Sequence, residues 1–246
     1  MTGIIIQARK GSTRLPNKMV LPFYQEKGVL ELLIEKLTTH FPTNKIVLAT
    51  TNNPLDDELV NIAENHKIQY YRGSENNVLE RFINAAVKHN LKTVVRICAD
   101  NPFLEMEHIF KFIDEIESEN ADYVSYKLPN GLPTIKSHLG LFTEIVSLKA
   151  LQKVNKSTSL SLYQEHVTNY IYEHPEEFKI KLIEMPNYMD DTENIRLTLD
   201  TIEDFKLEQQ LYHEMKGESI EHLVNYLKKN QRLQQQMQQE ISKHTK

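Results

Sequence analysis

Cysteine and tryptophan are almost absent from this chain of 246 residues, which has one cysteine and no tryptophan. The single thiol, Cys98, excludes a disulfide framework and a zinc cluster of cysteines, and its apolar surroundings predict a reduced core residue. Long apolar runs are missing too, and the first residues lack the pattern of a secretory signal. We therefore expect a soluble, cytoplasmic protein that does not bind membranes.

An excess of positive charge is also missing, because the formal net charge is −5. This balance argues against general binding of nucleic acid, so a local cluster of cations must serve a local purpose. The length allows one large α/β domain or two small ones, and either would bury a substantial core.

Short apolar strands alternate with amphipathic helices through the first half of the chain. The pattern predicts strands over 3–7, 45–50, 68–71, 93–98 and 123–126, separated by helices over 30–40, 55–66, 78–89 and 106–119. Such alternation is typical of βαβ units and a mostly parallel sheet.

The second half is less regular, and residues 127–141 form an irregular excursion from the sheet. Beyond it the pattern predicts strands over 142–146, 179–184 and 196–199, and helices from 147, over 163–174 and over 202–215. We divide the chain into a domain of residues 1–215 and a helical tail of residues 216–246. The tail has spaced apolar positions and a glutamine-rich run, and we favour a solvated terminal helix over an oligomer contact.

The loop after the first strand, residues 7–18, is the most informative segment. It contains four cations, two hydroxyls and one glycine: Arg9, Lys10, Arg14, Lys18, Ser12, Thr13 and Gly11. Open α/β sheets bind ligands where their strands end, and cations with backbone amides suit a polyphosphate there. Because the cations follow directly after a strand, phosphate binding is favoured over the alternative of a solvated basic loop.

Two aspartates, Asp100 and Asp200, follow predicted strands at the same edge of the sheet. Taken singly, each fits a structural role better, and Asp200 could be the N-cap of the next helix. Beside a triphosphate loop, however, the pair suits Mg²⁺, which prefers carboxylates together with substrate phosphates. Such an ion would neutralise charge while an α-phosphate is attacked and pyrophosphate leaves.

Residues 7–18, 71–82 and 95–102 resemble the cytidylyltransferase superfamily, which includes the CMP-KDO and CMP-acylneuraminate synthetases. The nearest branch is the SpsF-like spore coat polysaccharide biosynthesis proteins, to which residues 165–168 and 199–204 are also similar. The resemblance runs from about residue 3 to residue 212. It implies a Rossmann-like nucleotide-diphospho-sugar transferase (GT-A-like) fold, with a mostly parallel central sheet and helices on both faces, and a homodimer.

The resemblance also implies roles for individual residues. Arg9, Arg14 and Lys18 would be the catalytic cations on the triphosphate, and Asp100 and Asp200 would hold Mg²⁺. The expected nucleotide site consists of Ala8, Arg9, Gly11, Ser12, Lys18, Thr50, Thr51, Arg72, Arg96 and Asp100.

The excursion is expected to cover the site and to bring Lys136 and His138 to an acidic acceptor, with an exposed loop as an equal alternative. Glu144, Glu165 and His166 complete the expected acceptor site, although a histidine in such a position is more often structural.

The chain departs from the family pattern at two positions. Thr198 stands where the synthetases often have a second acid, and this weakens a two-acid metal site on that strand. Phe142 replaces the aspartate of a Gly-Leu-Asp-Val-Glu stretch in the SpsF-like chains. The second departure makes a phosphorylated or phosphonate acceptor as suitable as a sugar acid.

Taken with the cationic loop and the two aspartates, the resemblance implies a cytidylyltransferase that moves CMP from CTP to an acidic acceptor, with Mg²⁺, for surface polysaccharide or glycoconjugate biosynthesis. One alternative is a glycosyltransferase of the same fold, but the Asp-x-Asp motif of those enzymes is missing after the fourth strand. The other is a non-catalytic nucleotide-binding protein, which would not need Lys18, Asp100 and Asp200 together.

Overall fold

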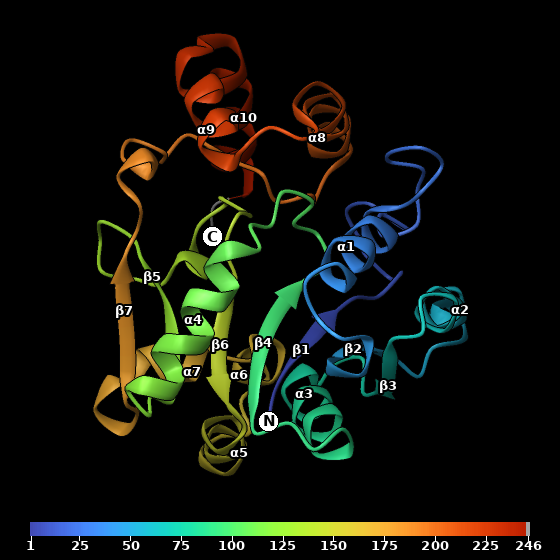
Figure 1. The fold of residues 1–246 in the computed structure, drawn as a ribbon, viewed down its shortest axis with the longest axis vertical. Coiled ribbons are helices and arrows are strands. Elements are labelled where there is room, and N and C mark those ends of the chain that lie inside the picture. The colour runs from blue at the N-terminus through green and yellow to red at the C-terminus, as the bar shows by residue number, and fades with distance from the viewer. Residues whose placement is uncertain (245–246) are drawn as a thin grey trace.

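A seven-stranded sheet forms the centre of the protein in a computed structural model that describes residues 1–244 (Figure 1). The strands are β1 (Thr2–Gln7), β2 (Ile46–Thr51), β3 (Gln69–Gly73), β4 (Thr93–Cys98), β5 (Tyr123–Lys127), β6 (Glu144–Ser147) and β7 (Ile180–Glu184). They lie in the order β3-β2-β1-β4-β6-β5-β7, and only β6 runs antiparallel to its neighbours. The predicted mostly parallel sheet is confirmed.

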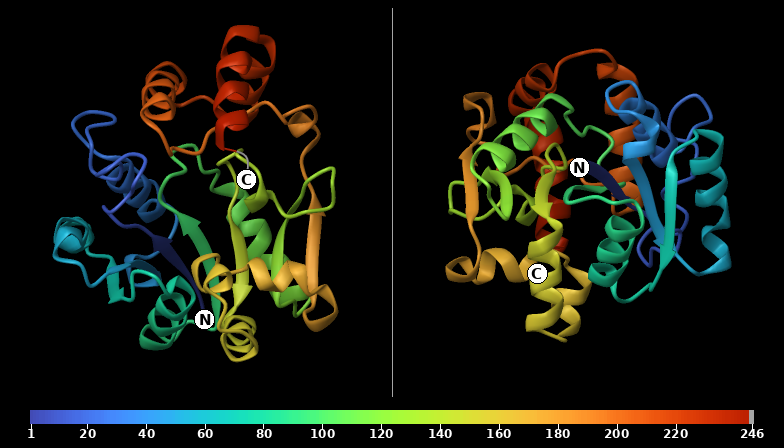
Figure 2. Two further views of the ribbon diagram at one scale, coloured as in Figure 1. Left: turned by 180° about the vertical axis from the view of Figure 1, so that it is seen from behind. Right: turned by 60° about the horizontal axis from the view of Figure 1, so that its bottom comes forward.

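Helices cover both faces of the sheet, as predicted (Figures 1 and 2). One apolar core packs against α1 (Val29–Thr38), α2 (Asp57–Asn65) and α4 (Glu107–Ser118), and the other against α3 (Val78–Lys88), α5 (Leu148–Ser157) and α7 (Asn169–Glu173). Successive strand residues point to opposite faces, so Ile4 and Ile6 enter the first core and Ile5 the second. The short helix α6 (Ser161–Glu165) lies beside α3.

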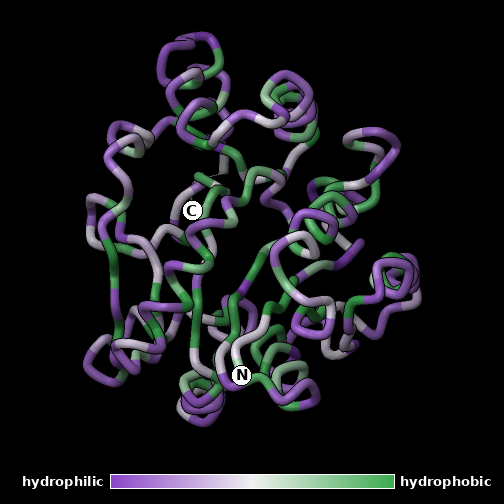
Figure 3. Tube along the Cα trace, viewed as in Figure 1, coloured by the Kyte–Doolittle hydropathy of each residue, from purple (hydrophilic) through white to green (hydrophobic). Residues whose placement is uncertain are grey.

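Figure 3 shows this arrangement as hydrophobic central strands inside largely hydrophilic outer turns. Single 3-10 turns connect several elements: η1 (Thr43–Lys45), η2 (Pro54–Asp56), η3 (Thr134–Lys136), η4 (Pro175–Glu177) and η5 (Asn187–Met189). Within residues 1–244, no helix is both long enough and apolar enough to cross a membrane.

Three further helices, α8 (Ile202–Met215), α9 (Ile220–Lys229) and α10 (Gln231–His244), lie beyond the carboxyl ends of the parallel strands (Figure 1, top). Gln7 of β1 is in register with Ala49 of β2 and Cys98 of β4, so the loops after these strands start at one level. This edge of the sheet is where the parallel arrangement predicts a ligand.

Residues 196–199, predicted as a strand, form an extended segment without a place in the sheet. The Leu197 N–H donates to the His138 carbonyl at 2.8 Å and the Leu199 N–H to the Asp100 carbonyl at 2.9 Å. Both leucines are fully buried. The alternating apolar pattern therefore reflects burial between two loops rather than pairing in a ladder.

The single helix predicted over 163–174 is instead two short helices, α6 and α7. The chain leaves the helical conformation at His166, where φ is −100° and ψ is 77°. The Thr168 hydroxyl then donates to the buried Glu144 carboxylate at 2.7 Å, which draws this turn towards the sheet. A long-range hydrogen bond thus overrides the local helical pattern.

The expectation that the tail is simply a solvated helix is wrong. Leu223, Leu227 and Met237 are at most 2% exposed and belong to the same core as the central strands. The outward positions of α10 are mostly glutamines, which explains its low mean hydropathy in the sequence. One face of α9 and α10 is therefore part of the main core.

Candidate functional site

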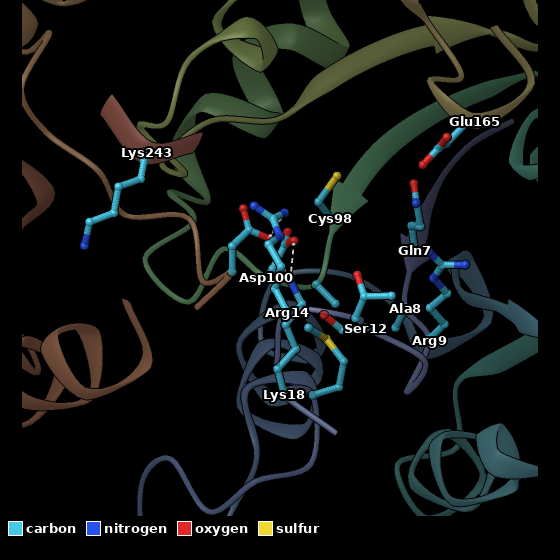
Figure 4. A pocket seen from close by; sticks show the side chains of 14 residues that line it. Gln7, Ala8, Arg9, Ser12, Arg14, Lys18, Cys98, Asp100, Glu165 and Lys243 are labelled. Carbon is cyan, nitrogen blue, oxygen red and sulfur yellow. Dashed lines mark hydrogen bonds and ion pairs between the residues drawn. The ribbon is translucent and has the colours of Figure 1, made fainter. Parts of the chain in front are cut away.

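A cavity of about 560 Å³ lies at the carboxyl edge of the sheet (Figure 4). The loop after β1, the end of β4, the end of α6, the segment before α8 and the end of α10 all contribute to its wall. Its lining residues are Gln7, Ala8, Arg9, Ser12, Thr13, Arg14, Lys18, Met19, Cys98, Ala99, Asp100, Glu165, Asp200 and Lys243. The structure thus brings together every residue predicted to be catalytic or to hold metal.

Lys18 is the centre of this cluster. Its Nζ donates to Asp100 Oδ2 at 2.9 Å, to Asp200 Oδ1 at 3.1 Å and to the Leu199 carbonyl at 2.7 Å. The preceding residue, Asn17, has a left-handed backbone with φ of 62°, a conformation that asparagine tolerates better than most residues. This turn sends the lysine side chain inward.

The Lys18 ammonium remains charged in this setting. Burial disfavours the charged form, but attraction and hydrogen bonds from Asp100 and Asp200 outweigh it and raise the lysine pKa above its ordinary value. The neighbouring thiol behaves differently, since burial raises the pKa of Cys98 to about 11. Cys98 is therefore a protonated thiol at neutral pH, but it lies partly exposed at the cavity wall, so the prediction that it is a core residue is wrong.

Asp200 is not the N-cap of the next helix, so the structural alternative for this residue is wrong. Thr201 caps α8, and a capping box joins its side chain to Asp204. Asp200 instead faces the cavity, where Arg14 pairs with its Oδ1 at 2.9 Å and Arg196 approaches its Oδ2 at 3.5 Å.

A buried ion pair supports Asp200 from behind. Arg196 donates to both oxygens of Asp204 at 2.7 Å, and both side chains are at most 4% exposed. Burial tends to raise the Asp204 pKa, but the hydrogen bonds and charge of Arg196 outweigh this effect and lower it. In the sequence, only two opposite charges eight residues apart mark this pair.

Thr50 and Thr51, predicted to lie near the base, do not line the cavity. Both are at most 1% exposed, and both hydroxyls donate to Asp56 Oδ2. The other oxygen of Asp56 accepts the Lys10 N–H at 2.8 Å. Asp56, which the sequence did not identify, therefore ties the end of β2 to the loop after β1.

Arg72 is likewise outside the cavity. Its guanidinium donates to the Thr51 carbonyl at 2.9 Å, to the Asn53 carbonyl at 2.8 Å and to Asp57 at 2.6 Å. It braces the turn after β2, and its predicted contact with the nucleotide stays a prediction.

Arg96 and Glu144, predicted for the nucleotide and the acceptor, lie behind the cavity wall as a buried ion pair of 2.6 Å. Arg96 also donates to Gln7 Oε1 at 3.2 Å. Because a guanidinium only donates, the oxygen of Gln7 faces Arg96 and its amide NH₂ is left for the cavity. Gln7 was missed in the sequence, where its signal was a polar residue ending a buried strand.

The excursion does not cover this cavity within the described residues. His138 and Ser137 line a second cavity of about 250 Å³, and Arg196 donates to His138 Nδ1 at 2.7 Å. Lys136 lies 6.0 Å from the ring of Tyr172. His166 ends α6 and is exposed, so among the predicted acceptor residues only Glu165 lines the main cavity.

Gly11 is exposed, and a Cβ there would meet only the Glu75 carboxylate at an ordinary 3.4 Å, so packing does not require glycine. Lys243, brought to the cavity by α10, was missed because the tail was expected to be solvated. Figure 4 shows Lys243 on the opposite side of the cavity from Glu165 and Gln7.

Comparisons with known proteins agree with the fold. Residues 3–241 match the sequence model of a family described as cytidylyltransferase. The spore coat polysaccharide biosynthesis protein SpsF of Bacillus subtilis is 30% identical over 234 residues, which cover 92% of this chain and 93% of that protein. An uncharacterized protein of Methanocaldococcus jannaschii is 39% identical over 228 residues, or 92% of this chain and 90% of that protein.

Solved structures are also similar. A cytidylyltransferase from Leptospira borgpetersenii is 31% identical, with a TM-score of 0.83 and coverage of 95% of this chain and 96% of that one. A CMP-KDO synthetase in complex with CTP shares the fold, with 13% identity, a TM-score of 0.64 and coverage of 87% and 98%.

Proposed function

The chain belongs to the cytidylyltransferase family of nucleotidyltransferases, and we propose that it transfers CMP from CTP to an acidic acceptor and releases pyrophosphate. The acceptor is a sugar acid or a phosphorylated or phosphonate small molecule, and its product enters surface polysaccharide or glycoconjugate biosynthesis. The observation that carries the proposal is the convergence of Lys18, Asp100 and Asp200 in one cavity beside Arg9 and Arg14.

Arg9 and Arg14 are suited to receive a triphosphate. Their side chains are 42% and 47% exposed, and within residues 1–244 each forms a single ion pair, with Glu75 and Asp200 respectively. Exposed ion pairs contribute little free energy, so a phosphate oxygen can replace the carboxylate at low cost. Guanidinium groups then bind phosphate with two parallel hydrogen bonds.

Asp100 and Asp200 are suited to hold Mg²⁺. They come from different segments, yet their carboxylates already share one cation, the Lys18 ammonium. Carboxylate oxygens are the ligands Mg²⁺ prefers, with substrate phosphates filling further positions. When bound there, the ion would neutralise charge on the triphosphate.

In the proposed reaction an acceptor oxygen attacks the α-phosphorus and the bond to the bridging oxygen breaks. Pyrophosphate leaves with the bonding electron pair, and any acceptor proton passes to solvent. Lys18, Arg9 and Arg14 stabilise the negative charge that moves to pyrophosphate, so positioning and electrostatics suffice without a protein nucleophile. The protonated Cys98 thiol is consistent with this route.

CTP is the proposed nucleotide because a CMP-KDO synthetase of this fold was solved with CTP. Gln7 and Glu165, on one side of the cavity, offer an amide donor and a carboxylate acceptor for a base or a sugar. A homodimer belongs to the same proposal, and light scattering of the purified chain would measure its mass.

The test is pyrophosphate release with Mg²⁺, in which CTP, UTP, ATP and GTP are each combined with a pool of acidic sugars and phosphorylated metabolites. Release that requires CTP and one acceptor would support the proposal and identify the substrate. Lys10→Ala is a matched control, because Lys10 lies in the same loop but pairs with Glu58. Consumption of a nucleotide-sugar without pyrophosphate release would point to a glycosyltransferase instead.

A further inference from the structure

The position that a metal ion would need is already taken by a charged side chain. Lys18 Nζ donates to Asp100 Oδ2 at 2.9 Å and to Asp200 Oδ1 at 3.1 Å. Arg14 shares the same Asp200 oxygen at 2.9 Å, and Arg196 lies 3.5 Å from the other. Both oxygens of Asp200 therefore face cations before any ligand is added.

A divalent cation and the Lys18 ammonium cannot both occupy this position. Two cations a few ångströms apart repel each other strongly where water is largely excluded, and the Lys18 side chain is only 10% exposed. If metal alone displaced the lysine, the ammonium would keep the Leu199 carbonyl as its remaining partner here. A largely buried charge that loses its counter-ions is costly, so metal alone should bind weakly.

A triphosphate removes this conflict, because its oxygens can receive both Lys18 and Arg14. We propose that Lys18 is the resident cation of the metal site: it neutralises Asp100 and Asp200 in the ligand-free protein and moves to the triphosphate when metal binds. Metal and nucleotide consequently bind cooperatively. The nucleotide half of this inference rests on the proposed function, whereas the competition between Lys18 and metal does not.

Substitution of Lys18 should have opposite effects on the binding of metal and of nucleotide. Lys18→Met removes the competing charge, so it should tighten metal binding in the absence of nucleotide. It also removes a partner of the triphosphate, so it should weaken nucleotide binding and reduce the coupling between the two ligands, which is reciprocal. A lysine that served only the triphosphate would leave the affinity for metal alone unchanged.

The deciding experiment is a titration with Mn²⁺ alone, in which free metal is measured by electron paramagnetic resonance. Lys18→Met should raise the affinity by about tenfold or more, because the repulsion between neighbouring cations is lost. The control Lys10→Met removes the same charge from the same loop, outside the aspartate pair, and should leave the affinity unchanged. Adding Asp200→Asn to Lys18→Met should abolish the gain.

An affinity for Mn²⁺ that is equal or lower in Lys18→Met would overturn the inference while leaving the proposed function intact. Conversely, Lys18→Met could bind Mn²⁺ tenfold more tightly while the unaltered chain releases no pyrophosphate with any nucleotide and acceptor. That outcome would support the competition between Lys18 and metal and reject the proposed reaction. If the variant misfolds, a second test uses the unaltered chain. Brief acetylation read by mass spectrometry should label Lys18 faster when Mn²⁺ is added, and unchanged labelling would count against the inference.

Discussion

Two groups of charged residues lie at the same edge of the sheet, but they differ in what surrounds them. The cavity group consists of Arg9, Arg14, Lys18, Asp100 and Asp200. The side chains of Arg9 and Arg14 are more than 40% exposed and pair with Glu75 and Asp200 respectively. In the buried group, formed by the pairs Arg96–Glu144 and Arg196–Asp204, no side chain is more than 8% exposed. Both groups contain residues that the sequence assigned to the site or its edge.

The difference shows that residue type does not separate a binding residue from a supporting one. An exposed ion pair can exchange a carboxylate for a phosphate at little cost. A buried pair cannot, because removing one partner leaves the other charge unpaired in a medium of low polarity. Substitutions in the cavity group should therefore affect turnover, and substitutions in the buried group should affect stability.

The largest effect is expected for Arg196→Met. This change leaves Asp204 buried without its partner, and losing one member of a buried pair costs about 3–5 kcal/mol. Urea denaturation followed by circular dichroism measures the loss. The double variant Arg196→Met/Asp204→Asn should recover part of it, and a loss below about 1 kcal/mol, the range of exposed pairs, would contradict the contrast between the two groups.

Lys18→Ala should act on turnover. Loss of a preorganised cation at the developing charge should lower the rate of pyrophosphate release by roughly 10²-fold or more. Lys10→Ala serves as the control, and thermal unfolding checks that both variants fold. Near wild-type release by Lys18→Ala would remove the loop after β1 from the mechanism.

Asp100→Asn tests the metal side of the cavity group. It removes a ligand charge, so the Mg²⁺ concentration for half-maximal activity should rise by at least the roughly 10–100-fold that loss of a ligand's hydrogen-bond partner costs. The measurement is activity against Mg²⁺ at fixed CTP and acceptor. An unchanged Mg²⁺ dependence would exclude Asp100 as a ligand.

The smallest effect is expected on the pH dependence of stability. Two acids one turn apart on α8, Asp204 and Glu208, contribute to it with opposite signs. Burial, with repulsion from Asp204, raises the Glu208 pKa well above its ordinary value, and neither Glu208 oxygen has a hydrogen-bond partner within residues 1–244. Folded Glu208 therefore binds its proton more tightly than the unfolded chain does, and it costs stability as pH rises above the unfolded pKa of 4.5.

The Asp204 carboxyl has the opposite sign, because its folded pKa is lowered. Its stabilising contribution is present above the unfolded pKa of 3.8 and is lost as pH falls through the folded value. Glu208→Gln should thus become progressively more stable than the parent chain as pH rises above 4.5. Urea unfolding at several pH values measures this trend, and parallel curves would show that Glu208 is not buried as an unpaired acid.

Features fixed by nearby residues could be predicted from the sequence. The alternation of strands and helices in the first half, and the loop that brings Arg9 and Lys18 to the sheet edge, follow from local apolar periodicity and from the order of residues. Asp100 and Asp200 were found in the same way, because each follows an apolar run. These predictions needed no knowledge of distant partners.

Features fixed by distant partners could not be predicted. Arg96 and Glu144 are 48 residues apart, and neither their buried pairing nor the hydrogen bond from Arg96 to Gln7 follows from the local sequence. His138 meets Arg196 across 58 residues, which draws the excursion to a second cavity. The sheet order, with β6 next to β4, brings Arg96 and Glu144 together.

The wall of the main cavity includes both Gln7 and Lys243. During synthesis on a ribosome, the loop after β1 emerges long before α10 exists. Chains generally begin to fold as they emerge, so the early loop must wait for α10 before its binding pocket is complete. An intermediate that stops before residue 231 would present the cationic loop and the apolar patch beneath Met237 to solvent, which makes it a natural client for chaperones.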